Sequence, residues 1–236
     1  MDWHNAYEKI LPYVVRIDSD DGFGTGYLFA YNKNHNVAVI ATAAHVIDKA
    51  YEWRKPLKLF HYGSKKEIFL KYAERAIWID RKRDAASVLI DVGSLDFPQD
   101  ALPLIEVDKY QKIGVEVGWV GFPVLAPSNL CFFSGKVSHF VEEEDSYFID
   151  GVAINGVSGG PVFKYNPDES LQVIGIVSAY MPNRRIGDTL PGLLFAHDVT
   201  SFHEHLKKIN DLDEAKEQEK AAQKTDEKQA EQGGKK

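Results

Sequence analysis

Gly156-Val157-Ser158-Gly159-Gly160-Pro161 decides the fold that this chain is expected to adopt, because it sets a serine among glycines after an apolar run. Glycines adopt backbone conformations that other residues avoid, so a glycine-rich turn is one way to expose a nucleophilic side chain. The same turn, placed before the predicted strand 161–164, is also compatible with a plain structural role for the hydroxyl. The role of Ser158 therefore depends on what the rest of the chain supplies.

Two segments upstream carry the side chains that a nucleophilic serine needs. His45 follows the predicted strand 37–42, and Asp84 stands just before the apolar run 85–90. A histidine can accept the proton that the serine hydroxyl loses, and an aspartate can hold the histidine in the required tautomer. Asp80 competes for the second role but could instead cap a turn, and the strand that follows favours Asp84. The order His, Asp, Ser is one of the chain orders in which such triads occur.

The composition is that of a globular protein, and the chain is long enough to fold without disulfide bonds. The chain has 236 residues, of which 44% are hydrophobic, and a formal net charge of -7. A chain of this length can bury about 70% of its unfolded surface. The single cysteine, Cys131, excludes an intrachain disulfide and favours a reducing compartment, so we expect a cytoplasmic location, for example in a bacterium. Cys131 itself is expected to be a buried small hydrophobe.

The same composition argues against two classes of partner. The mildly acidic balance gives no electrostatic footprint for nucleic acid. No run of about 18 apolar residues is present, so no membrane span is expected, and the N-terminal residues lack the apolar core of a secretory signal.

Short apolar runs separated by turn residues, at a spacing of about 8 to 12 residues, predict an all-β sandwich or barrel. The chain is predicted to divide into an N-terminal helix and first half over 1–92, a linker over 93–110, a second half over 111–200, a helix over 201–210 and a charged low-complexity tail over 211–236. About six strands fall in each half. Only the two ends show helical spacing, and the tail carries no apolar stripe, so it is expected to be transiently helical or disordered.

Several segments together resemble the trypsin-like (chymotrypsin-fold) serine peptidases, and within them the disulfide-poor branch that includes the HtrA (Deg) proteases. The segments that match in order and spacing are 10–17, 22–27, 42–45, 84–86, 118–123, 134–138, 153–161 and 175–178. The resemblance covers roughly residues 10–209. It implies two six-stranded antiparallel β-barrels with terminal helices, the first within 1–92 and the second within 111–200, and an active site between them. It implies no metal and no organic cofactor. The chain departs from the HtrA pattern in that no PDZ domain is expected after the peptidase body.

The resemblance implies that Ser158 is the nucleophile, His45 the general base and Asp84 its partner, with the amides of Gly156 and Ser158 forming an oxyanion hole. Val157 departs from the family pattern, which has an aspartate here in the digestive branch and usually an asparagine in the HtrA branch. The loop before the serine is also one residue shorter than in the HtrA branch. Whether the oxyanion hole is preformed therefore stays open.

The family alignment places the base and walls of the substrate pocket on small and apolar side chains. The predicted substrate-binding residues are Val152, Ala153, Ser178, Ala179, Tyr180 and Leu193. Without an acidic residue there, a preference for Lys or Arg is not expected, and Tyr180 is expected to narrow the pocket. We therefore expect small or medium apolar side chains at P1. The segment 181–191 is expected to be a surface loop or a flap over the site.

Two alternatives accompany the prediction of a serine endopeptidase acting on proteins or peptides. The first is a latent or inactive protease-fold module that binds or regulates and is switched on by a partner. The second is that the charged tail recruits a protein partner. His203 and His205 are two residues apart and do not share a helix face, so no metal site is expected there.

Overall fold

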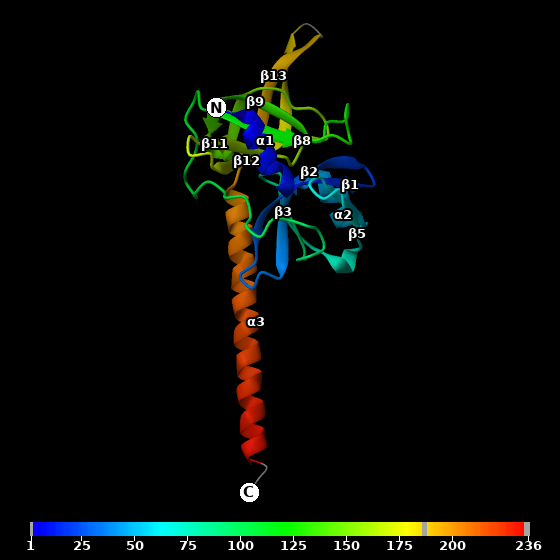
Figure 1. Cartoon of the computed structure of the whole chain (residues 1–236), viewed down its shortest axis with the longest axis vertical. Coiled ribbons are helices and arrows are strands. Elements are labelled where there is room, and N and C mark those ends of the chain that lie inside the picture. Colours follow the sequence, from blue (N-terminus) through cyan, green and yellow to red (C-terminus); the bar gives the residue numbers. More distant parts are fainter. Residues whose placement is uncertain (1, 186–187, 234–236) are drawn as a thin grey trace.

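The computed structural model describes residues 2–185 and 188–233, with side chains described outside 180–192, 221 and 224–233. The chain forms a seven-stranded antiparallel sheet followed by a closed six-stranded barrel (Figure 1). The predicted all-β, chymotrypsin-like fold is therefore confirmed, but the first half forms a seven-stranded sheet where a six-stranded barrel was predicted. The first half is a half-barrel, in which the strands run in the order β5-β4-β1-β2-β3-β7-β6.

The first half holds two helices and seven strands, listed in chain order. They are α1 (Trp3–Ile10), β1 (Val14–Ser19), β2 (Gly22–Tyr31), β3 (Val37–Ala43), α2 (Ala44–Glu52), β4 (Leu57–His61), β5 (Glu67–Leu70), β6 (Ala76–Asp80) and β7 (Ala85–Asp91). Strand β6 was not predicted, because its side chains are partly exposed on both faces and give no alternating pattern.

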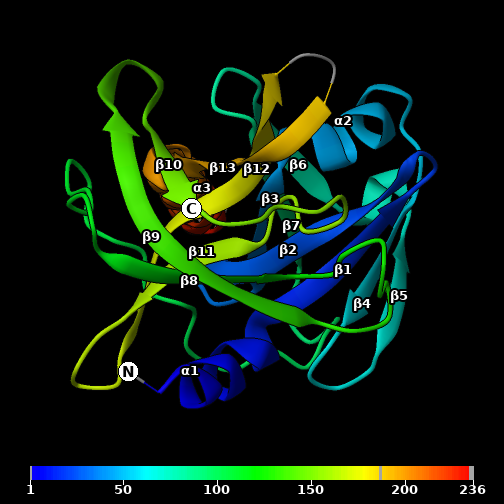
Figure 2. The same cartoon turned by 90° about the horizontal axis from the view of Figure 1, so that it is seen from above.

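The second half is the barrel, and one long helix follows it. These elements are β8 (Glu116–Gly121), β9 (Cys131–Val141), β10 (Ser146–Asp150), β11 (Pro161–Tyr165), β12 (Leu171–Arg185), β13 (Asp188–Asp198) and α3 (Thr200–Gly233). Seen from above, β9 is a long curved strand that runs across the molecule, and β4 and β5 lie at the edge of the first half (Figure 2). Among the helices that the structure describes, none is both long and apolar enough to cross a bilayer.

Helix α2 corrects the expectation that only the chain ends are helical. Its buried residues Ala44, Ile47 and Ala50 recur at helical spacing and pack against the first-half core. The run is nine residues long and follows directly on β3. Because helix and strand patterns merge over so short an apolar stretch, the periodicity did not separate them. His45 consequently lies in the first turn of a helix, and not at the end of a strand.

Both terminal helices reach across to the other half of the molecule. Helix α1 precedes the first half, yet Trp3 packs against Phe132 and Phe163 of the barrel. Helix α3 leaves the barrel and runs past the first half, where Asp213 accepts a hydrogen bond from Asn32 at 2.5 Å. Figure 1 shows α3 continuing well beyond the body. It therefore extends past the helix predicted for 201–210, into the segment expected to be a charged tail.

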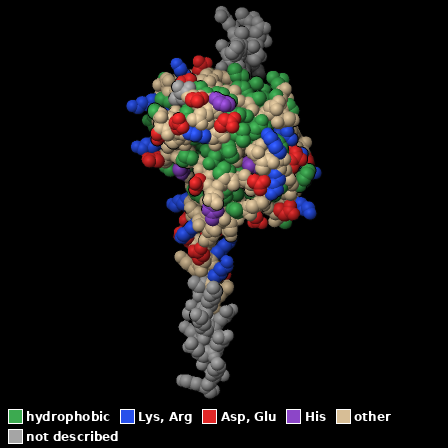
Figure 3. Space-filling view, in the orientation of Figure 1, with side chains coloured by type: hydrophobic (Ala, Val, Ile, Leu, Met, Phe, Trp, Pro, Cys, Tyr) green, Lys and Arg blue, Asp and Glu red, His purple; other side chains and the backbone are tan. Residues whose placement is uncertain are grey.

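The hairpin of β12 and β13 is longer than predicted. The segment 181–191, expected to be a loop or a flap, consists of paired strand up to Arg185 and from Asp188, and the two strands project from the barrel (Figure 1). The turn at 186–187 lies outside the described residues. On the face visible in Figure 3, side chains of both charge signs are interspersed around a central band of hydrophobic ones.

Candidate active site

The register of two strands brings His45 and Asp84 together. Strands β3 and β7 pair antiparallel, with Ala43 opposite Ala85 at the end of the ladder. The chain leaves β3 into α2 and enters β7 from a turn, so the next residues outward face each other. The Ala44 N–H donates to the Asp84 carbonyl at 2.9 Å and extends the ladder by one step.

The carboxylate of Asp84 accepts hydrogen bonds from two N–H groups of His45, one in the ring and one in the backbone. Oδ2 accepts from the ring Nδ1 at 2.8 Å, and Oδ1 accepts from the backbone N–H at 3.0 Å. Ala43, at the N-cap of α2, offers no side-chain hydrogen bond, so Asp84 caps this helix from the turn before β7. A carboxylate at a helix N-terminus is also favoured by the helix dipole.

These contacts set the charge states of the pair. The hydrogen bond to Asp84 raises the pKa of His45, against the opposing effect of burial. Burial would raise the pKa of Asp84, but hydrogen bonds from His45 and Ser178 outweigh it and the pKa is lowered. Asp84 is thus an anion near neutral pH, and His45 is a stronger base than a free imidazole.

Ser178 contacts both ends of this arrangement. Its hydroxyl donates a short hydrogen bond to Asp84 Oδ2, and its carbonyl lies 3.5 Å from Oγ of Ser158. We predicted Ser178 as a wall of the substrate pocket; its described contacts are with the predicted catalytic residues. Among the residues that the structure describes, no hydrogen bond joins the Ser158 hydroxyl to His45.

The loop before Ser158 forms a tight turn whose geometry bears on the oxyanion hole. The Val157 N–H donates to the Ile154 carbonyl at 3.0 Å, and Gly156 has a φ of +93°. These features define a type II turn, which needs positive φ at its third residue and therefore glycine. A Cβ at Gly156 would also lie 2.2 Å from the Phe122 carbonyl oxygen.

The peptide between Asn155 and Gly156 is fixed from outside the turn. Its carbonyl accepts a hydrogen bond from the Val124 N–H at 2.8 Å. In a planar trans peptide the N–H points opposite to the carbonyl, so the Gly156 N–H is directed away from Val124. Within the described part of the chain, the N–H groups of Gly156 and Ser158 donate to no protein acceptor.

Thr25 on β2 links this loop to the first half, a role that was not predicted. It is fully buried, its N–H donates to the Ser158 carbonyl at 2.8 Å, and its hydroxyl donates to the Gly156 carbonyl at 2.8 Å. The same hydroxyl accepts from the Phe122 N–H at 3.1 Å. In the sequence only its flanking glycines stand out, and they indicate a hairpin rather than a support for a distant loop.

Val157, the residue that departs from the family pattern, is fully buried in the main apolar cluster. It packs against Gly121, where a Cβ would lie 2.8 Å from Val157 Cα. Burial of a valine needs no charged partner, so apolar packing takes the place of the ion pair that an aspartate would require here.

A hollow of about 340 Å³ opens beside Ser158. The residues that line it come from the β1–β2 turn, α2 and the loops on either side of the type II turn: Ser19, Asp21, Gly22, Phe23, His45, Val46, Val124, Asn155, Gly156 and Ser158. Of the predicted site residues, His45, Gly156 and Ser158 therefore all line this hollow. Phe23 and Val46 were not predicted, because an apolar side chain in one sequence does not reveal whether it lines a core or a cleft.

The residues predicted for the substrate pocket lie on the loop 151–160 and on the β12–β13 hairpin. Val152 is 54% exposed and Ala153 is half-buried. Ala179 is exposed on β12, and Leu193 is half-buried on β13. The side chain of Tyr180 lies outside the described residues.

The remaining candidates have structural contacts. His205 Nδ1 receives the Ser87 hydroxyl at 2.8 Å, and His203 donates to the Ile105 carbonyl at 2.7 Å. Asp80, the competitor of Asp84, binds Arg83 and Ser201 instead of a histidine. Cys131 is half-buried, and burial raises the pKa of its thiol, which therefore stays protonated.

The chain was also compared with known proteins. The sequence profile of the trypsin-like peptidase domain matches residues 24–176, which is more than half of the chain. A search of curated proteins finds no match.

Three solved structures show the same fold. A serine endoprotease from Yersinia pestis superposes with a TM-score of 0.65 at 19% identity, covering 89% of this chain and 66% of that one. The Rv3671c protease of M. tuberculosis, in an inactive form, gives 0.62 at 19% identity, covering 86% of this chain and 91% of that one. Deg5 gives 0.63 at 18% identity, with coverages of 85% and 90%. The chain thus spans just under two thirds of the Yersinia protein. With the profile match over more than half of its length, the chain belongs to the trypsin-like peptidase family.

Proposed function

We propose that this protein is an endopeptidase that cleaves peptide bonds through an acyl-enzyme on Ser158. The observation that carries the proposal is the pairing of His45 with the half-buried Asp84 at 2.8 Å, beside a hollow lined by both His45 and Ser158. A serine hydroxyl is a weak nucleophile at neutral pH and needs such a base.

In the first half-reaction, the Ser158 oxygen attacks the carbonyl carbon of the scissile bond while its proton passes to Nε2 of His45. The imidazolium is stabilised by Asp84 through Nδ1. Collapse of the tetrahedral intermediate breaks the C–N bond, and His45 returns the proton to the leaving amine. The ester on Ser158 remains.

In the second half-reaction, water takes the place of the amine. His45 removes a proton from the water as its oxygen attacks the ester carbonyl, and the intermediate expels the Ser158 oxygen, which regains the proton from His45. The products are a carboxylic acid and the free enzyme, so no metal or organic cofactor takes part.

The oxyanion of both intermediates is assigned to the N–H groups of Gly156 and Ser158. The type II turn and the Val124 contact support this assignment. They hold the Asn155 carbonyl toward Val124, so the Gly156 N–H of the same peptide points in the opposite direction. Fixed donors of this kind typically contribute about 100- to 1000-fold in rate.

We further assign small or medium apolar side chains to the P1 position. The support is the character of Val152 and Ala153 in the loop 151–160 and the absence of an acidic residue from the predicted pocket set. A cleavage profile on a peptide library tests this, and preferential cleavage after Lys or Arg would contradict it.

The test of the main proposal is covalent labelling by a fluorophosphonate probe, read by mass spectrometry, together with peptide cleavage. Wild type should gain one probe adduct at Ser158 and cleave peptides, and Ser158→Ala should do neither. Ser134→Ala, which alters an exposed serine on β9, should behave as wild type. A folded wild-type protein that is not labelled and cleaves nothing under any condition would refute the proposal.

One observation favours a second candidate, a latent protease that a partner or substrate activates. The Ser158 hydroxyl contacts the Ser178 carbonyl at 3.5 Å instead of His45. In this case labelling is slow in the isolated protein and accelerates when a peptide product or a partner is added. Equal labelling rates with and without such additions would contradict latency and support a constitutively active enzyme.

A further inference from the structure

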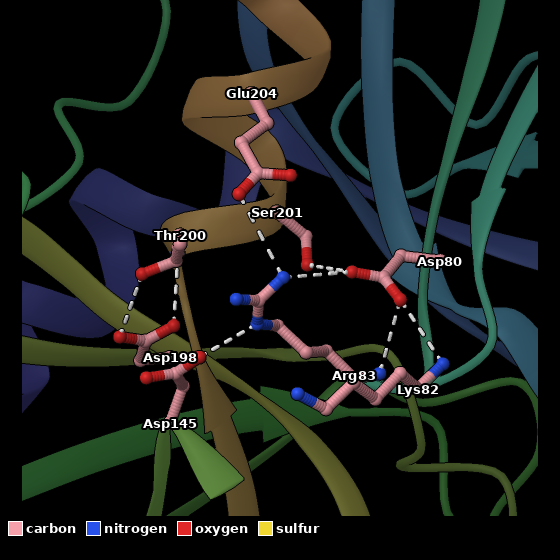
Figure 4. A network of polar contacts seen from close by, with 8 residues as sticks. All are labelled: Asp80, Lys82, Arg83, Asp145, Asp198, Thr200, Ser201 and Glu204. Carbon is pink, nitrogen blue, oxygen red and sulfur yellow. Dashed lines mark hydrogen bonds and ion pairs between the residues drawn. The ribbon is translucent and has the colours of Figure 1, made fainter. Parts of the chain in front are cut away.

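Arg83 stands directly before Asp84 and is the centre of a network of ion pairs (Figure 4). Its Nε donates to Asp145 Oδ2 at 2.7 Å, and its Nη1 donates to Asp80 Oδ2 at 3.1 Å. Nη1 also lies 3.7 Å from Glu204 Oε1. We call Arg83, Asp80, Asp145, Ser201 and Glu204 the Arg83 node.

The Arg83 node joins three parts of the fold. Asp80 ends β6 and Arg83 lies in the β6–β7 turn of the first half, and Asp145 precedes β10 in the barrel. Ser201 and Glu204 lie in the first two turns of α3, and the Ser201 hydroxyl donates to Asp80 Oδ2 at 2.8 Å. Figure 4 shows the guanidinium between the turn, the barrel and the helix.

The pKa values of Arg83 and Asp80 are both shifted in the direction that keeps these side chains charged. Burial acts to lower the pKa of Arg83, but hydrogen bonds to Asp145 and Asp80 raise it overall. Burial acts to raise the pKa of Asp80, but hydrogen bonds from Ser201 and Arg83 lower it overall. Only 20% of the Arg83 side chain and 19% of that of Asp80 are exposed, so solvent screens this pair less than a surface pair.

The node shapes the backbone at Asp84. Asp80 Oδ1 accepts the N–H groups of Lys82 and Arg83 at 3.0 and 3.2 Å and closes the turn. Asp84 then adopts a φ of +45°, in the left-handed region that residues with a Cβ avoid. Such a conformation is unfavourable for a residue with a Cβ and persists only where surrounding contacts impose it. The side chain of Arg83, the residue before Asp84, is bound by Asp80 from the first half and by Asp145 from the barrel.

We propose that the Arg83 node is a positioning device for the candidate active site. It holds Asp84 where its carboxylate receives both His45 N–H groups, and it does so through the docking of α3 and of the turn before β10. Arg83, Asp145 and Glu204 are positioning residues, since none of them touches a reacting atom. The inference rests on the proposed function, in which Asp84 is the partner of the general base.

The readout is the pKa of His45, because it reports the contact with Asp84 directly and does not require turnover. The titratable groups around Asp84 are His45 and His197, a buried histidine on β13 that feels the charges of Asp84, Glu144 and Asp80. Burial lowers the pKa of His197, so it stays neutral at the pH where His45 titrates.

The decisive variant is Arg83→Gln, which removes the charged fork and keeps much of the side-chain volume. An NMR titration of the imidazoles should show the pKa of His45 falling toward its ordinary value. In peptide cleavage, kcat should fall about tenfold or more with KM little changed. Arg83→Lys should recover part of both losses, because it restores the charge without the planar fork.

A matched control is available two residues away. Arg81 pairs with Asp48 and Glu52 on α2 at 2.8 and 3.0 Å and is more than half exposed. Arg81→Gln removes a similar set of ion pairs but does not reach Asp84, so the pKa of His45 and kcat should stay as in wild type. Glu204→Gln tests the α3 contact by itself and should shift both quantities in the same direction as Arg83→Gln, by less.

The outcomes separate the possibilities. If Arg83→Gln and Glu204→Gln lower the thermal stability but leave the pKa of His45 and kcat unchanged, the node is only structural and the inference is overturned. Should Arg83→Gln fail to fold, Arg83→Lys and Glu204→Gln decide by the same two readouts. If wild type is neither labelled nor active, the proposed function fails, while the titration of His45 still tests whether Arg83 positions Asp84.

Discussion

The Val124 N–H donates to the Asn155 carbonyl at 2.8 Å, and this single hydrogen bond fixes the direction of the peptide that carries the Gly156 amide. Val124 lies in the loop between β8 and β9, far in sequence from the turn that it holds. Because a type II turn can convert to type I by rotating its central peptide, an external acceptor–donor contact of this kind selects one of the two forms.

Val124→Pro is expected to release this peptide while leaving the loop intact. Val124 is the second residue of a turn closed by the Ala126 N–H on the Pro123 carbonyl at 2.8 Å, a position that accepts proline. Loss of the N–H should lower kcat by about 100-fold, the cost of losing one oxyanion donor. Val124→Ala keeps the N–H and should retain most of the activity. Equal kcat values for the two variants would show that the contact does not support the site.

Gly156→Ala is expected to destabilise the protein much more than a comparable glycine substitution in open space. The new Cβ meets the Phe122 carbonyl oxygen at 2.2 Å, and φ is +93°. Gly114→Ala is the control, because Gly114 has a φ of +85° and nothing within 4 Å. We expect about 1 kcal/mol for the control and about 3 kcal/mol or more for Gly156→Ala, measured by urea unfolding. Similar losses of unfolding free energy in the two variants would show that the positive φ alone, and not the contact with Phe122, causes the destabilisation.

Thr25→Val should weaken the contact between the two halves. The substitution keeps the shape but leaves the Gly156 carbonyl and the Phe122 N–H without their shared hydroxyl. Unpaired buried groups cost about 1 to 3 kcal/mol each, so a loss of about 3 kcal/mol in unfolding free energy is expected, with reduced probe labelling of Ser158. Ser146→Ala is the control, since the buried Ser146 hydroxyl has no partner in the described structure and its loss should be nearly neutral. A neutral Thr25→Val would contradict the role given to this hydroxyl.

His205 makes the stability of the protein depend on pH. Burial lowers its pKa from 6.5 to about 4. Between these values the unfolded chain binds more protons than the folded one, so the contribution of His205 is present above about pH 6.5 and is lost as the pH falls toward 4. The difference corresponds to at most about 3 kcal/mol.

The measurement is the unfolding free energy against pH in wild type and in His205→Gln, which cannot titrate. The variant should lose less stability than wild type between pH 6.5 and pH 4. His4→Gln, which removes an exposed histidine on α1, should follow the wild-type curve. Parallel curves for wild type and His205→Gln would show that His205 is not held neutral.

The sequence alone indicated the strands that carry the site, because alternation and turn residues are local properties. Strands β2, β3, β7 and β11 lie close to where their patterns placed them, and the family profile covers residues 24–176, which include nearly all of these strands. Local patterns did not separate α2 from the strand before it, nor find β6, because a short or two-sided exposed segment has no distinctive period.

What the sequence by itself determined was the family and the three residues on which the proposed chemistry rests, since the residue types and their order are written in it. The tertiary structure decided which other residues hold these three side chains in place. Register brings Asp84 onto both N–H groups of His45, while Thr25, Val124 and Arg83 act across distances of 31 to 133 positions in the chain. Such contacts leave no trace in local sequence, because a threonine, a valine or an arginine satisfies the same local pattern wherever its partner lies.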